Sequence, residues 1–435
     1  MQKVEPRTLA GFMELLPAEQ IAFNSMLDTI RRSYELFGFT PIETPAIEYS
    51  DVLLAKAGGE TEKQIYRFMR GDNDLCLHFD LTVPLARYVA EHYGQLTFPF
   101  RRYQIQKVWR AERPQKGRFR EFYQCDIDII GSKSPLVDAE IPSVIYSVFT
   151  TLGFDRFTIR VSNRKVLNGF LESLGLSNLC QDILRLVDKI EKQDRESLAT
   201  EIEALGISRE SVEKIFVFVG INGTTSEIIS QLQALGVQNS LFEEGLSELK
   251  TLVEGIATLG VPEANYKIDL TIARGLDYYT GTVYETVLDD YPSIGSVCSG
   301  GRYDDLASYY TDVELPGVGI SIGLTRLFDQ LRTAGLLKIG QSTPSKVLIV
   351  QVDSSFLTKS LEIATELRKQ GIPTEIYLED AKLGKQLKYA NKLQFPFVAI
   401  VGMNEAKDGE VVLKNMTTAE QSVMSIQQAA DTIKE

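Results

Sequence analysis

The chain has 435 residues, of which 44% are hydrophobic and 24% are charged, which is typical of a globular protein with two or three domains. Its formal net charge of -13 argues against general, sequence-independent binding of nucleic acid, although it allows a local basic surface. We find no apolar run near the ~18 residues of a membrane helix, and no N-terminal export signal.

The cysteine and histidine residues predict neither disulfides nor a metal site. Four cysteines (Cys76, Cys125, Cys180, Cys298) are far apart and form no C-x-x-C pair. We therefore expect reduced thiols in a cytoplasmic protein. Cys76 together with His78 offers two metal ligands, which do not make a site, so the spacing favours core positions.

The first part of the chain predicts one helix followed by many strands. Apolar residues recur with a helical period over 18–37, and Pro41 and Pro45 then indicate extended chain. Further helices are expected at 135–152 and 323–335. Because strands predominate over regular strand–helix alternation, we expect an α+β fold with a largely antiparallel sheet and flanking helices. The expected strands are 75–79, 100–110, 120–130, 157–162, 267–273, 282–289, 296–299 and 317–322.

The domain organisation follows from changes in pattern along the chain. Residues 164–265 form short helical stretches punctuated by Gly, Asn and Ser, which indicates a helical insertion between two parts of the sheet domain, 1–163 and 266–336. Residues 337–345 have the Gly, Pro and Ser of a linker. The remaining segment, 346–435, alternates strand and helix and predicts a separate α/β domain.

Residues 108–130, "VWRAERPQKGRFREFYQCDIDII", join two expected strands through a cationic loop. Strand alternation places Arg102 and Arg110 on one face of the first strand, and it places Gln124, Asp126 and Asp128 on one face of the second. A solvated surface hairpin is the alternative. Polar residues within alternating strands instead favour a polar ligand pocket, because buried polar groups must find partners.

The expected ligand of this pocket is anionic and flexible. Arginine forks suit phosphate groups, which points to a nucleoside triphosphate. The sequence has neither G-x-x-x-x-G-K-[ST] nor a G-x-G-x-x-G after a strand. We therefore expect arginines of a sheet, rather than a helix N-terminus, to hold the phosphates.

Four further segments place polar or glycine residues at strand ends, although core packing or a simple strand–helix join is the alternative for each. They are 76–90 with Asp80 and Thr82, 272–285 with Arg274, Tyr278 and Tyr279, 296–306 with Gly300, Gly301 and Tyr303, and 317–331 with Arg326.

Together these segments resemble the histidyl-tRNA synthetase family of class II aminoacyl-tRNA synthetases. "FTPIETPAIEY", "KVWRAERPQKGRFREFYQ" and "GVGISIGLTRL" resemble the three class motifs. "ARGLDYYTGTVYE" and "SGGRYDDL" resemble the two histidine-specific signatures, which discriminate better. The resemblance implies a homodimeric ligase. It would use ATP and Mg²⁺ to form histidyl-adenylate and pyrophosphate, and would then transfer histidine to tRNA(His).

The resemblance also implies roles for individual residues. The catalytic residues would be Arg110, at the α-phosphate, and Arg274, between the substrate carboxylate and that phosphate. ATP would further contact Glu112, Arg118 and Arg326. Histidine would be bound by Asp80, Thr82, Gln124, Asp128, Tyr278, Tyr279 and Tyr303, with Asp128 and Tyr279 at the imidazole. The tRNA would contact Arg113 and a basic stripe in the C-terminal domain, the anticodon-binding domain of the family, formed by Lys382, Lys385, Lys388 and Lys392. For that stripe a solvated helix face is the alternative.

The sequence departs from the family pattern at a few positions. Thr325 stands where many members have Glu before the arginine of the third motif, and another branch uses Glu at the positions of Asp80 and Asp128. Two other functions are possible: a regulatory subunit of ATP phosphoribosyltransferase, or a ligase for proline, threonine or glycine. The retained Arg110, Arg274 and Arg326 disfavour the first, and the histidine signatures disfavour the second.

Overall fold

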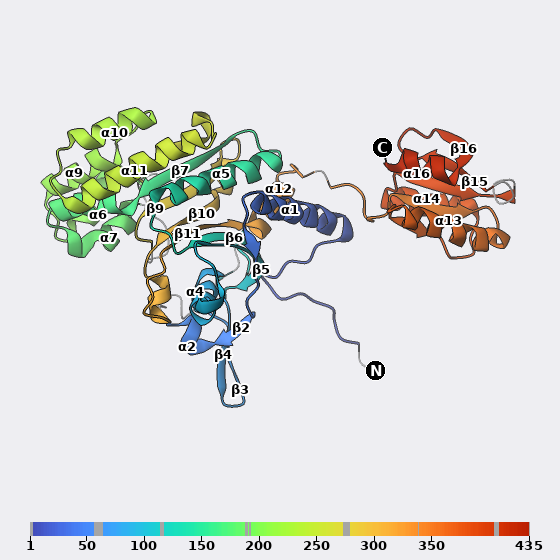
Figure 1. The fold of residues 1–435 in the computed structure, drawn as a ribbon, viewed down its shortest axis with the longest axis horizontal. Helices are drawn as coiled ribbons and strands as arrows, with labels where there is room; N and C mark the ends of the chain where they lie inside the picture. The colour runs from blue at the N-terminus through green and yellow to red at the C-terminus, as the bar shows by residue number, and fades with distance from the viewer. Residues whose placement is uncertain are drawn as a thin grey trace. The chain divides into compact units, whose positions relative to one another are not determined.

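The computed structural model describes residues 3–55, 64–113, 117–187, 190, 193–272, 279–337, 339–403 and 409–434. Contacts between Cα atoms divide the chain into two compact units. One consists of Met1–Met13 and Met26–Ala334, and the other of Glu14–Ser25 and Gly335–Glu435. Each unit contains a large sheet of its own (Figure 1).

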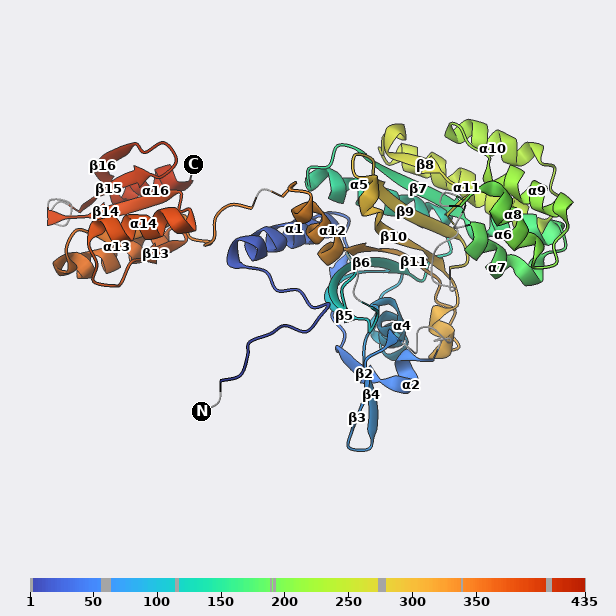
Figure 2. The ribbon, with the colours of Figure 1, turned by 180° about the vertical axis from the view of Figure 1, so that it is seen from behind.

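The first unit is built on an eight-stranded, largely antiparallel sheet (Figure 2). Its inner pairs are antiparallel, and only the two edge pairs, β1 with β5 and β7 with β8, are parallel. The strand order is β1(Thr40–Pro41), β5(Phe100–Trp109), β6(Glu121–Ile130), β11(Gly317–Gly323), β10(Ser296–Tyr303), β9(Thr282–Leu288), β7(Phe157–Asn163) and β8(Tyr266–Ile268).

Helices α1(Pro17–Leu36), α5(Pro135–Thr151) and α12(Leu324–Thr333) lie on one side of this sheet, and α4(Thr82–Glu91) lies on the other (Figure 1). The Tyr34 hydroxyl of α1 donates to the backbone carbonyl of Cys125 at 2.9 Å. Helix α5 begins at Pro135, where Ser134 caps it by accepting from the Leu136 amide. The opposite face of the sheet, on the α4 side, is where the predicted polar residues of β5 and β6 lie.

A three-stranded sheet precedes α4, with the order β2(Ile47–Tyr49), β4(Asn73–Leu77) and β3(Arg67–Arg70). The short helix α2(Ser50–Leu53) lies in the connection between β2 and β3, and α4 follows β4 on the chain. One face packs on a core that includes Leu53, Cys76 and Phe79. His78 is fully buried, its Nε2 lies 2.7 Å from the Lys107 carbonyl, and burial lowers its pKa, so it is a core histidine.

Between β7 and β8 the chain forms a series of helices. Its helices are α6(Arg164–Ser173), α7(Cys180–Val187), α8(Arg195–Glu203), α9(Arg209–Val219), α10(Thr225–Ala234) and α11(Ser240–Thr258). Asn, Asp, Ser or Thr side chains cap the N-termini of α6, α8, α9, α10 and α11. Helices α6 and α11 cross closely at glycines, since a Cβ on Gly169 would lie 2.3 Å from the Phe242 amide nitrogen.

The second unit is an α/β domain. Strands β12(Val347–Gln351), β13(Thr374–Ile376) and β14(Phe397–Val401) are parallel, and β15(Glu410–Asn415) and β16(Gln421–Ser425) are antiparallel, in the order β13-β12-β14-β15-β16. Its helices are α13(Leu357–Lys369), α14(Leu383–Leu393) and α16(Ile426–Lys434).

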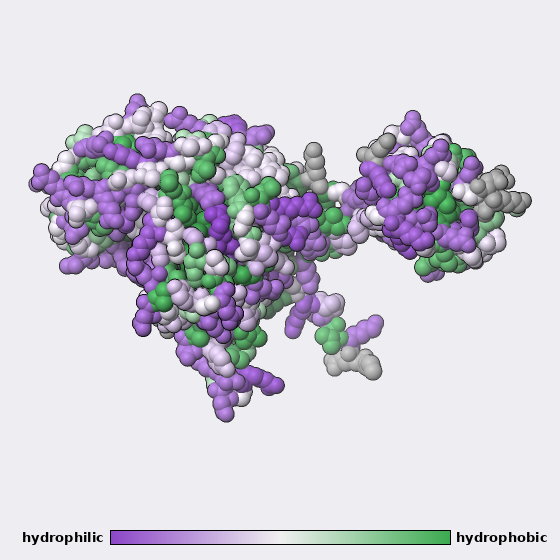
Figure 3. Space-filling view, in the orientation of Figure 1, coloured by the Kyte–Doolittle hydropathy of each residue, from purple (hydrophilic) through white to green (hydrophobic). Residues whose placement is uncertain are grey.

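The α+β fold class predicted from the sequence is confirmed, and the expected strands and helices occur within a few residues of their predicted bounds. One strand is wrong in extent: within 267–272 only Lys267 and Ile268 belong to β8, because the Thr271 amide and hydroxyl both bond to the Asp269 carboxylate in a turn, and residue 273 lies outside the described residues. Hydrophilic residues cover much of the face in Figure 3. None of the helices within the described residues is both long and apolar enough to cross a membrane.

Candidate active site

The candidate site lies on the face of the large sheet where β5, β6 and β11 run side by side. Their register pairs Arg102 with Asp128 and Asp128 with Gly319. Directly paired residues of antiparallel strands point to the same face, so the polar side chains of β6 face a common space. A Cβ on Gly319 would lie 2.2 Å from Asp128 Oδ1, so only glycine lets β11 pass this close to the carboxylate.

Two adjoining cavities occupy this face. The first, about 300 Å³, contains the carboxylates of Asp80, Asp126 and Asp128, and we call it the carboxylate cavity. The second, about 360 Å³, is lined by Arg110, Arg118 and Arg326, and we call it the cationic cavity. The residues that line both are Arg110, Gln124, Ser296, Ser299 and Ser321. Because the two cavities share a wall, ligands bound in them would lie side by side.

Asp128 is held in place from two sides within the carboxylate cavity. The Tyr303 hydroxyl donates to its Oδ1 at 2.7 Å, and Nη2 of Arg102 lies 2.5 Å from its Oδ2. Arg102 is fully buried. Nearby, Asp80 Oδ1 accepts from the Val83 amide at 3.2 Å at the start of α4. These contacts fix the directions in which both carboxylates present their remaining lone pairs.

Burial changes the acidity of all three carboxyl groups. Loss of solvent raises the pKa of Asp80 and of Asp128 to about 6 and that of Asp126 to about 7. The positive charge of Arg102 opposes this rise at each of them. Three groups with displaced pKa values in one cavity are characteristic of a functional site.

Several polar atoms in the wall of the carboxylate cavity have no hydrogen-bond partner within the described part of the chain. They are Asp80 Oδ2, Gln124 Oε1 and Asp126 Oδ1. Unsatisfied buried polar atoms are rare in folded proteins. Their convergence on one cavity therefore favours a polar ligand with hydrogen-bond donors.

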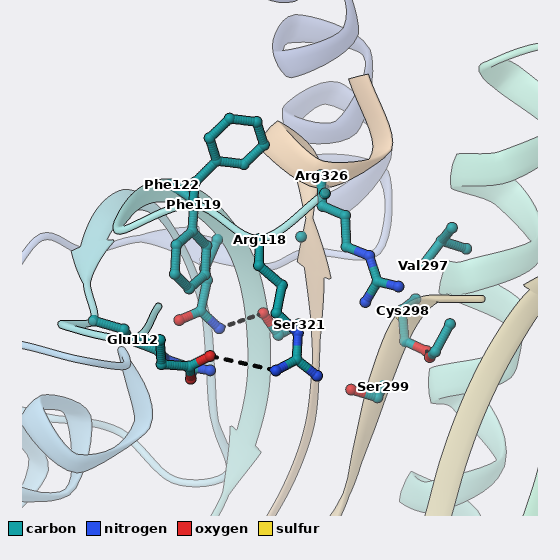
Figure 4. Close-up of a pocket in the computed structure, with 14 residues that line it drawn as sticks. Glu112, Arg118, Phe119, Phe122, Val297, Cys298, Ser299, Ser321 and Arg326 are labelled. Carbon is teal, nitrogen blue, oxygen red and sulfur yellow. Dashed lines mark hydrogen bonds and ion pairs between the residues drawn. The ribbon is translucent and has the colours of Figure 1, made fainter. Parts of the chain in front are cut away.

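The cationic cavity presents guanidinium groups from three elements. Arg110, just after β5, donates from Nε to the Phe79 carbonyl at 3.0 Å, and its Cζ lies 5.2 Å from the centre of the Phe122 ring. Arg326, on the first turn of α12, donates to the Ile294 carbonyl at 2.8 Å. Figure 4 shows Arg118 and Arg326 both extending into the cavity, with Arg118 paired to Glu112 at 3.6 Å. Paired N–H donors in this number suit phosphate oxygens.

The structure brings most of the predicted site residues together. Arg110, Glu112, Arg118 and Arg326 line the cationic cavity, and Asp80, Thr82, Gln124, Asp128, Tyr279 and Tyr303 line the carboxylate cavity. Arg113 is exposed and lines neither. Arg274 and Tyr278 lie outside the described residues.

The sequence pattern did not assign functions to other residues that line or support the cavities. Arg102 and Asp126 were placed on the correct strand faces but given no role, and Ser299, Ser321 and Phe122 were not considered. The alternation that selected Gln124 and Asp128 already marked Asp126. Arg102 could be assigned only through its register with Asp128, and that register depends on the fold.

Thr325, which departs from the family pattern, does not line either cavity. Its side chain is buried, and its Oγ1 accepts a hydrogen bond from the Tyr123 amide at 2.8 Å. Thr325 therefore ties the start of α12 to the start of β6 and supports the wall that carries Arg326.

The predicted basic stripe lies on α14 of the second unit. Lys385, Lys388 and Lys392 are exposed on this helix, Lys382 is exposed at its N-cap, and Gln386 and Ala390 are buried on its other side. The four lysines therefore form one solvent-facing surface, which we call the lysine stripe.

Comparison with known proteins identifies the family. The family model described as histidyl-tRNA synthetase matches residues 11–327, and an anticodon-binding domain matches residues 346–435. The chain belongs to the histidyl-tRNA synthetase family. It is 57% identical to the histidine–tRNA ligase of Clostridium tetani, over 99% of this chain and 98% of that protein. It is 48% identical to that of Xanthomonas campestris, over 99% of this chain and 96% of that protein.

The solved structures agree with this family assignment. The crystal structure of histidyl-tRNA synthetase from Nostoc sp. PCC 7120 is 41% identical and superposes with a TM-score of 0.93, covering 99% of each chain. A Bacillus halodurans structure, described as an ATP phosphoribosyltransferase regulatory subunit/histidyl-tRNA synthetase, has a TM-score of 0.77. It covers 92% of this chain and 99% of its own, but at 19% identity it shows a shared fold alone.

Proposed function

We infer that this histidyl-tRNA synthetase family member activates histidine with ATP and then transfers it to tRNA(His). The observation that carries this inference is the shared wall between the carboxylate and cationic cavities. One cavity offers acceptors for an amino acid with several N–H groups, and the other offers guanidinium groups for a triphosphate. The histidine carboxylate and the α-phosphate can then meet near Arg110, which lines both.

Histidine is proposed to occupy the carboxylate cavity. Its α-ammonium group would be bound by Asp80 and Thr82, with Gln124 beside them. Asp128 would accept one imidazole N–H, and the Tyr279 hydroxyl would contact the other ring nitrogen. An imidazole offers one donor and one acceptor, or two donors when protonated, so an acid and a phenol can read it. Tyr303, which donates to Asp128, would close the cavity, and Tyr278 would join this set.

ATP is proposed to occupy the cationic cavity. Arg110 would contact the α-phosphate and Arg326 the γ-phosphate end, while Glu112 and Arg118 would line the nucleotide mouth. Arg274 would stabilise the charge between the histidine carboxylate and the α-phosphate. Fixed guanidinium groups at these oxygens stabilise the charge that accumulates during phosphoryl transfer.

The reaction then proceeds in two displacements. A carboxylate oxygen of histidine attacks the α-phosphorus, the bond to the bridging oxygen breaks, and pyrophosphate leaves. The terminal ribose hydroxyl of the tRNA next attacks the carbonyl carbon of the adenylate, loses its proton, and releases AMP. Holding both reactants in adjoining cavities makes the first step effectively unimolecular, which lowers its barrier.

Magnesium is proposed to accompany ATP. Among the described residues that line the cationic cavity, Glu112 alone carries a carboxylate. Mg²⁺ commonly uses one or two protein carboxylates, with phosphate oxygens and water supplying the rest of its shell, so this donor set fits the ion. When bound, it would screen the β- and γ-phosphates, and Glu112 is the side chain that would hold it.

A homodimer is proposed through the three-stranded sheet β2-β4-β3. Register and alternation place a row of apolar side chains on the face opposite the buried Cys76. Exposed fractions of 47% for Ile47 and 55% for Tyr49 are high for such residues. Contiguous exposed apolar residues of this kind mark interaction surfaces, and two-fold dimers are the commonest assembly. The row consists of Ile47, Tyr49, Phe68, Leu75 and Leu77.

A reduced compartment such as the cytoplasm is also proposed. All four cysteines are free thiols, and Cys76, Cys125 and Cys298 are buried.

Histidine-dependent exchange of radiolabelled pyrophosphate into ATP tests the activation step. We expect exchange with histidine and Mg²⁺, and none above background with proline, threonine or glycine. A site built around ligand hydrogen bonds rejects analogues by about 10⁴-fold. Folded protein that shows no exchange at saturating histidine would contradict the proposed activity, and exchange with another amino acid would contradict the assigned specificity.

The lysine stripe is proposed to contact the tRNA backbone, together with Arg113 near the active site. Changing Lys385 and Lys388 to glutamine should raise the KM for tRNA(His) about tenfold at low salt, since phosphate contacts contribute charge rather than sequence reading. Pyrophosphate exchange, which needs no tRNA, should not change. The matched control is Lys359 and Lys369 to glutamine on α13 of the same unit. An equal effect of the control pair would remove the stripe from tRNA binding.

A further inference from the structure

Arg102 is a charged side chain that the proposed chemistry does not use. It lies in the middle of β5, and its side chain has no exposed surface. Its Nη2 lies 2.5 Å from Asp128 Oδ2, while its Nε and Nη1 have no hydrogen-bond partner among the described residues. A buried guanidinium with one charged contact is expensive to keep unless its charge is needed.

The surroundings of Arg102 explain why a buried cation is needed. Asp126 and Asp128 lie on the neighbouring strand β6, and Asp80 lies just before α4, so three buried carboxyl groups share one cavity. Without a cation, burial and mutual repulsion favour protonation of each group. A protonated Asp128 would donate a proton where the proposed imidazole contact requires an acceptor.

We propose that Arg102 is a positioning residue for histidine recognition: it orients Asp128 and keeps it ionised at neutral pH, without touching the substrate. The inference rests on the proposed contact between Asp128 and the imidazole. Burial raises the pKa of Asp128, and the positive charge of Arg102 is the largest influence that lowers it, ahead of the hydrogen bond from Tyr303.

Other titratable groups also face this pair, and their charges enter the same balance. On the cavity side they are Asp126 on β6, Asp80 before α4, Arg110 after β5, Tyr279 before β9, Glu285 on β9 and Tyr303 on β10. Cys125 alternates to the other face of β6, where Tyr34 of α1 lies near Cys125 and Cys298. Arg160 pairs with Glu285 at 3.2 Å, so among the described residues Arg102 and Arg110 are the arginines that face the three aspartates.

The test is the pH dependence of the KM for histidine in Arg102→Met relative to wild type, measured by pyrophosphate exchange with the full chain. Methionine fills much of the arginine volume but carries no charge. The ratio of the two KM values should be about tenfold or more near pH 6 and should shrink toward pH 9, because a raised pKa reduces the ionised fraction of Asp128 mainly at low pH. Because histidine itself titrates in the same way in both measurements, its titration cancels in the ratio of variant to wild-type KM.

Two further variants separate charge from packing. Arg102→Lys keeps a buried cation, so its KM profile should follow wild type more closely than that of Arg102→Met. Adding Asp126→Asn to Arg102→Met removes one competing negative charge and should lower the KM ratio again. The matched control is Arg101→Met, which removes the neighbouring arginine of β5 that pairs with Glu140 on the other face. Its KM ratio should stay near one at every pH.

A KM ratio for Arg102→Met that is constant with pH would overturn the inference and leave Arg102 a packing residue. If Arg102→Met does not fold, Arg102→Lys provides the test instead. A KM profile of Arg102→Lys that is displaced to higher pH relative to wild type would also overturn the inference. Asp128→Asn tests the proposed imidazole contact separately from the role of Arg102. An unchanged histidine KM in Asp128→Asn would refute the imidazole contact itself, whereas a raised one alongside a pH-independent Arg102→Met ratio would refute only the role of Arg102.

Discussion

Replacing Asp128 with asparagine should raise the KM for histidine by about 10²- to 10³-fold. The amide keeps the shape of the side chain but removes the charge, so the imidazole loses an anionic acceptor and Arg102, 2.5 Å away, loses its counter-charge. Removing one member of a buried, hydrogen-bonded charge pair costs about 2–5 kcal/mol. The KM for ATP should change little, because Asp128 lines only the carboxylate cavity.

The pH profile should also change in a defined direction. The pKa of Asp128 is raised to about 6, so its acceptor form is present above that pH and is lost as the pH falls through about 6. In wild type, kcat/KM for histidine should therefore fall below pH 6 as both Asp80 and Asp128 take up protons. In Asp128→Asn, Asp80 is the one of these two groups that remains, so the decline should be shallower.

Glu140→Gln is the matched control for Asp128→Asn. Glu140 pairs at 2.7 Å with Arg101, the neighbour of Arg102 on β5, but it lies on α5 at the opposite face of the sheet. This variant loses a carboxylate from an arginine pair without altering the cavity, and its histidine KM should equal that of wild type. A similar rise in both variants would indicate a general weakening of the sheet rather than loss of an imidazole contact.

Much of the candidate site could be predicted from local sequence pattern. The alternation in "EFYQCDIDII" is sufficient to put Gln124, Asp126 and Asp128 on one face of β6, because side-chain direction in a strand has a strict period of two. Strand ends and glycine pairs similarly located Asp80 and Tyr303. These predictions depend on only a few consecutive residues, so they can be made without knowing the fold.

Pairings between distant segments could not be predicted in this way. Arg102 was placed on the correct face, but its ionic partner depends on the register between β5 and β6. Thr325 was an unexplained departure in the sequence, and its hydrogen bond to the Tyr123 amide spans 202 positions. Arg302, inside the "SGGRYDDL" signature, was given no role, because its partner Asp138 lies 164 positions away on α5.

That pairing of Arg302 with Asp138 should carry a large share of the stability of the first unit. Alternation on β10 directs Tyr303 into the carboxylate cavity and Arg302 to the other face. There Arg302 Nε donates to Asp138 Oδ1 at 3.0 Å, and the Thr282 hydroxyl donates to Oδ2 at 2.7 Å. Both charged side chains are almost fully buried, with exposed fractions of 6% and 4%. Of these two adjacent signature residues, Tyr303 therefore lines the ligand cavity and Arg302 supports the sheet from the other face.

Asp138→Asn should lower the free energy of unfolding of the first unit by about 3–5 kcal/mol, because it leaves the buried Arg302 guanidinium with only the half-buried Asp304 carboxylate, 3.8 Å away, as a counter-charge. Trp109 on β5 is the single tryptophan, so its fluorescence during urea denaturation reports on this unit and not on the C-terminal one.

Asp290→Asn is the control. It removes an ion pair with Arg156 whose partners are 44% and 70% exposed, and it should change stability by less than about 1 kcal/mol. Replacing both partners, with Arg302→Met and Asp138→Leu, should recover part of the loss, since no unpaired charge remains buried. If Asp138→Asn unfolds at the wild-type urea concentration, the pair does not stabilise the join between β10 and α5, and the position of Tyr303 must depend on other contacts.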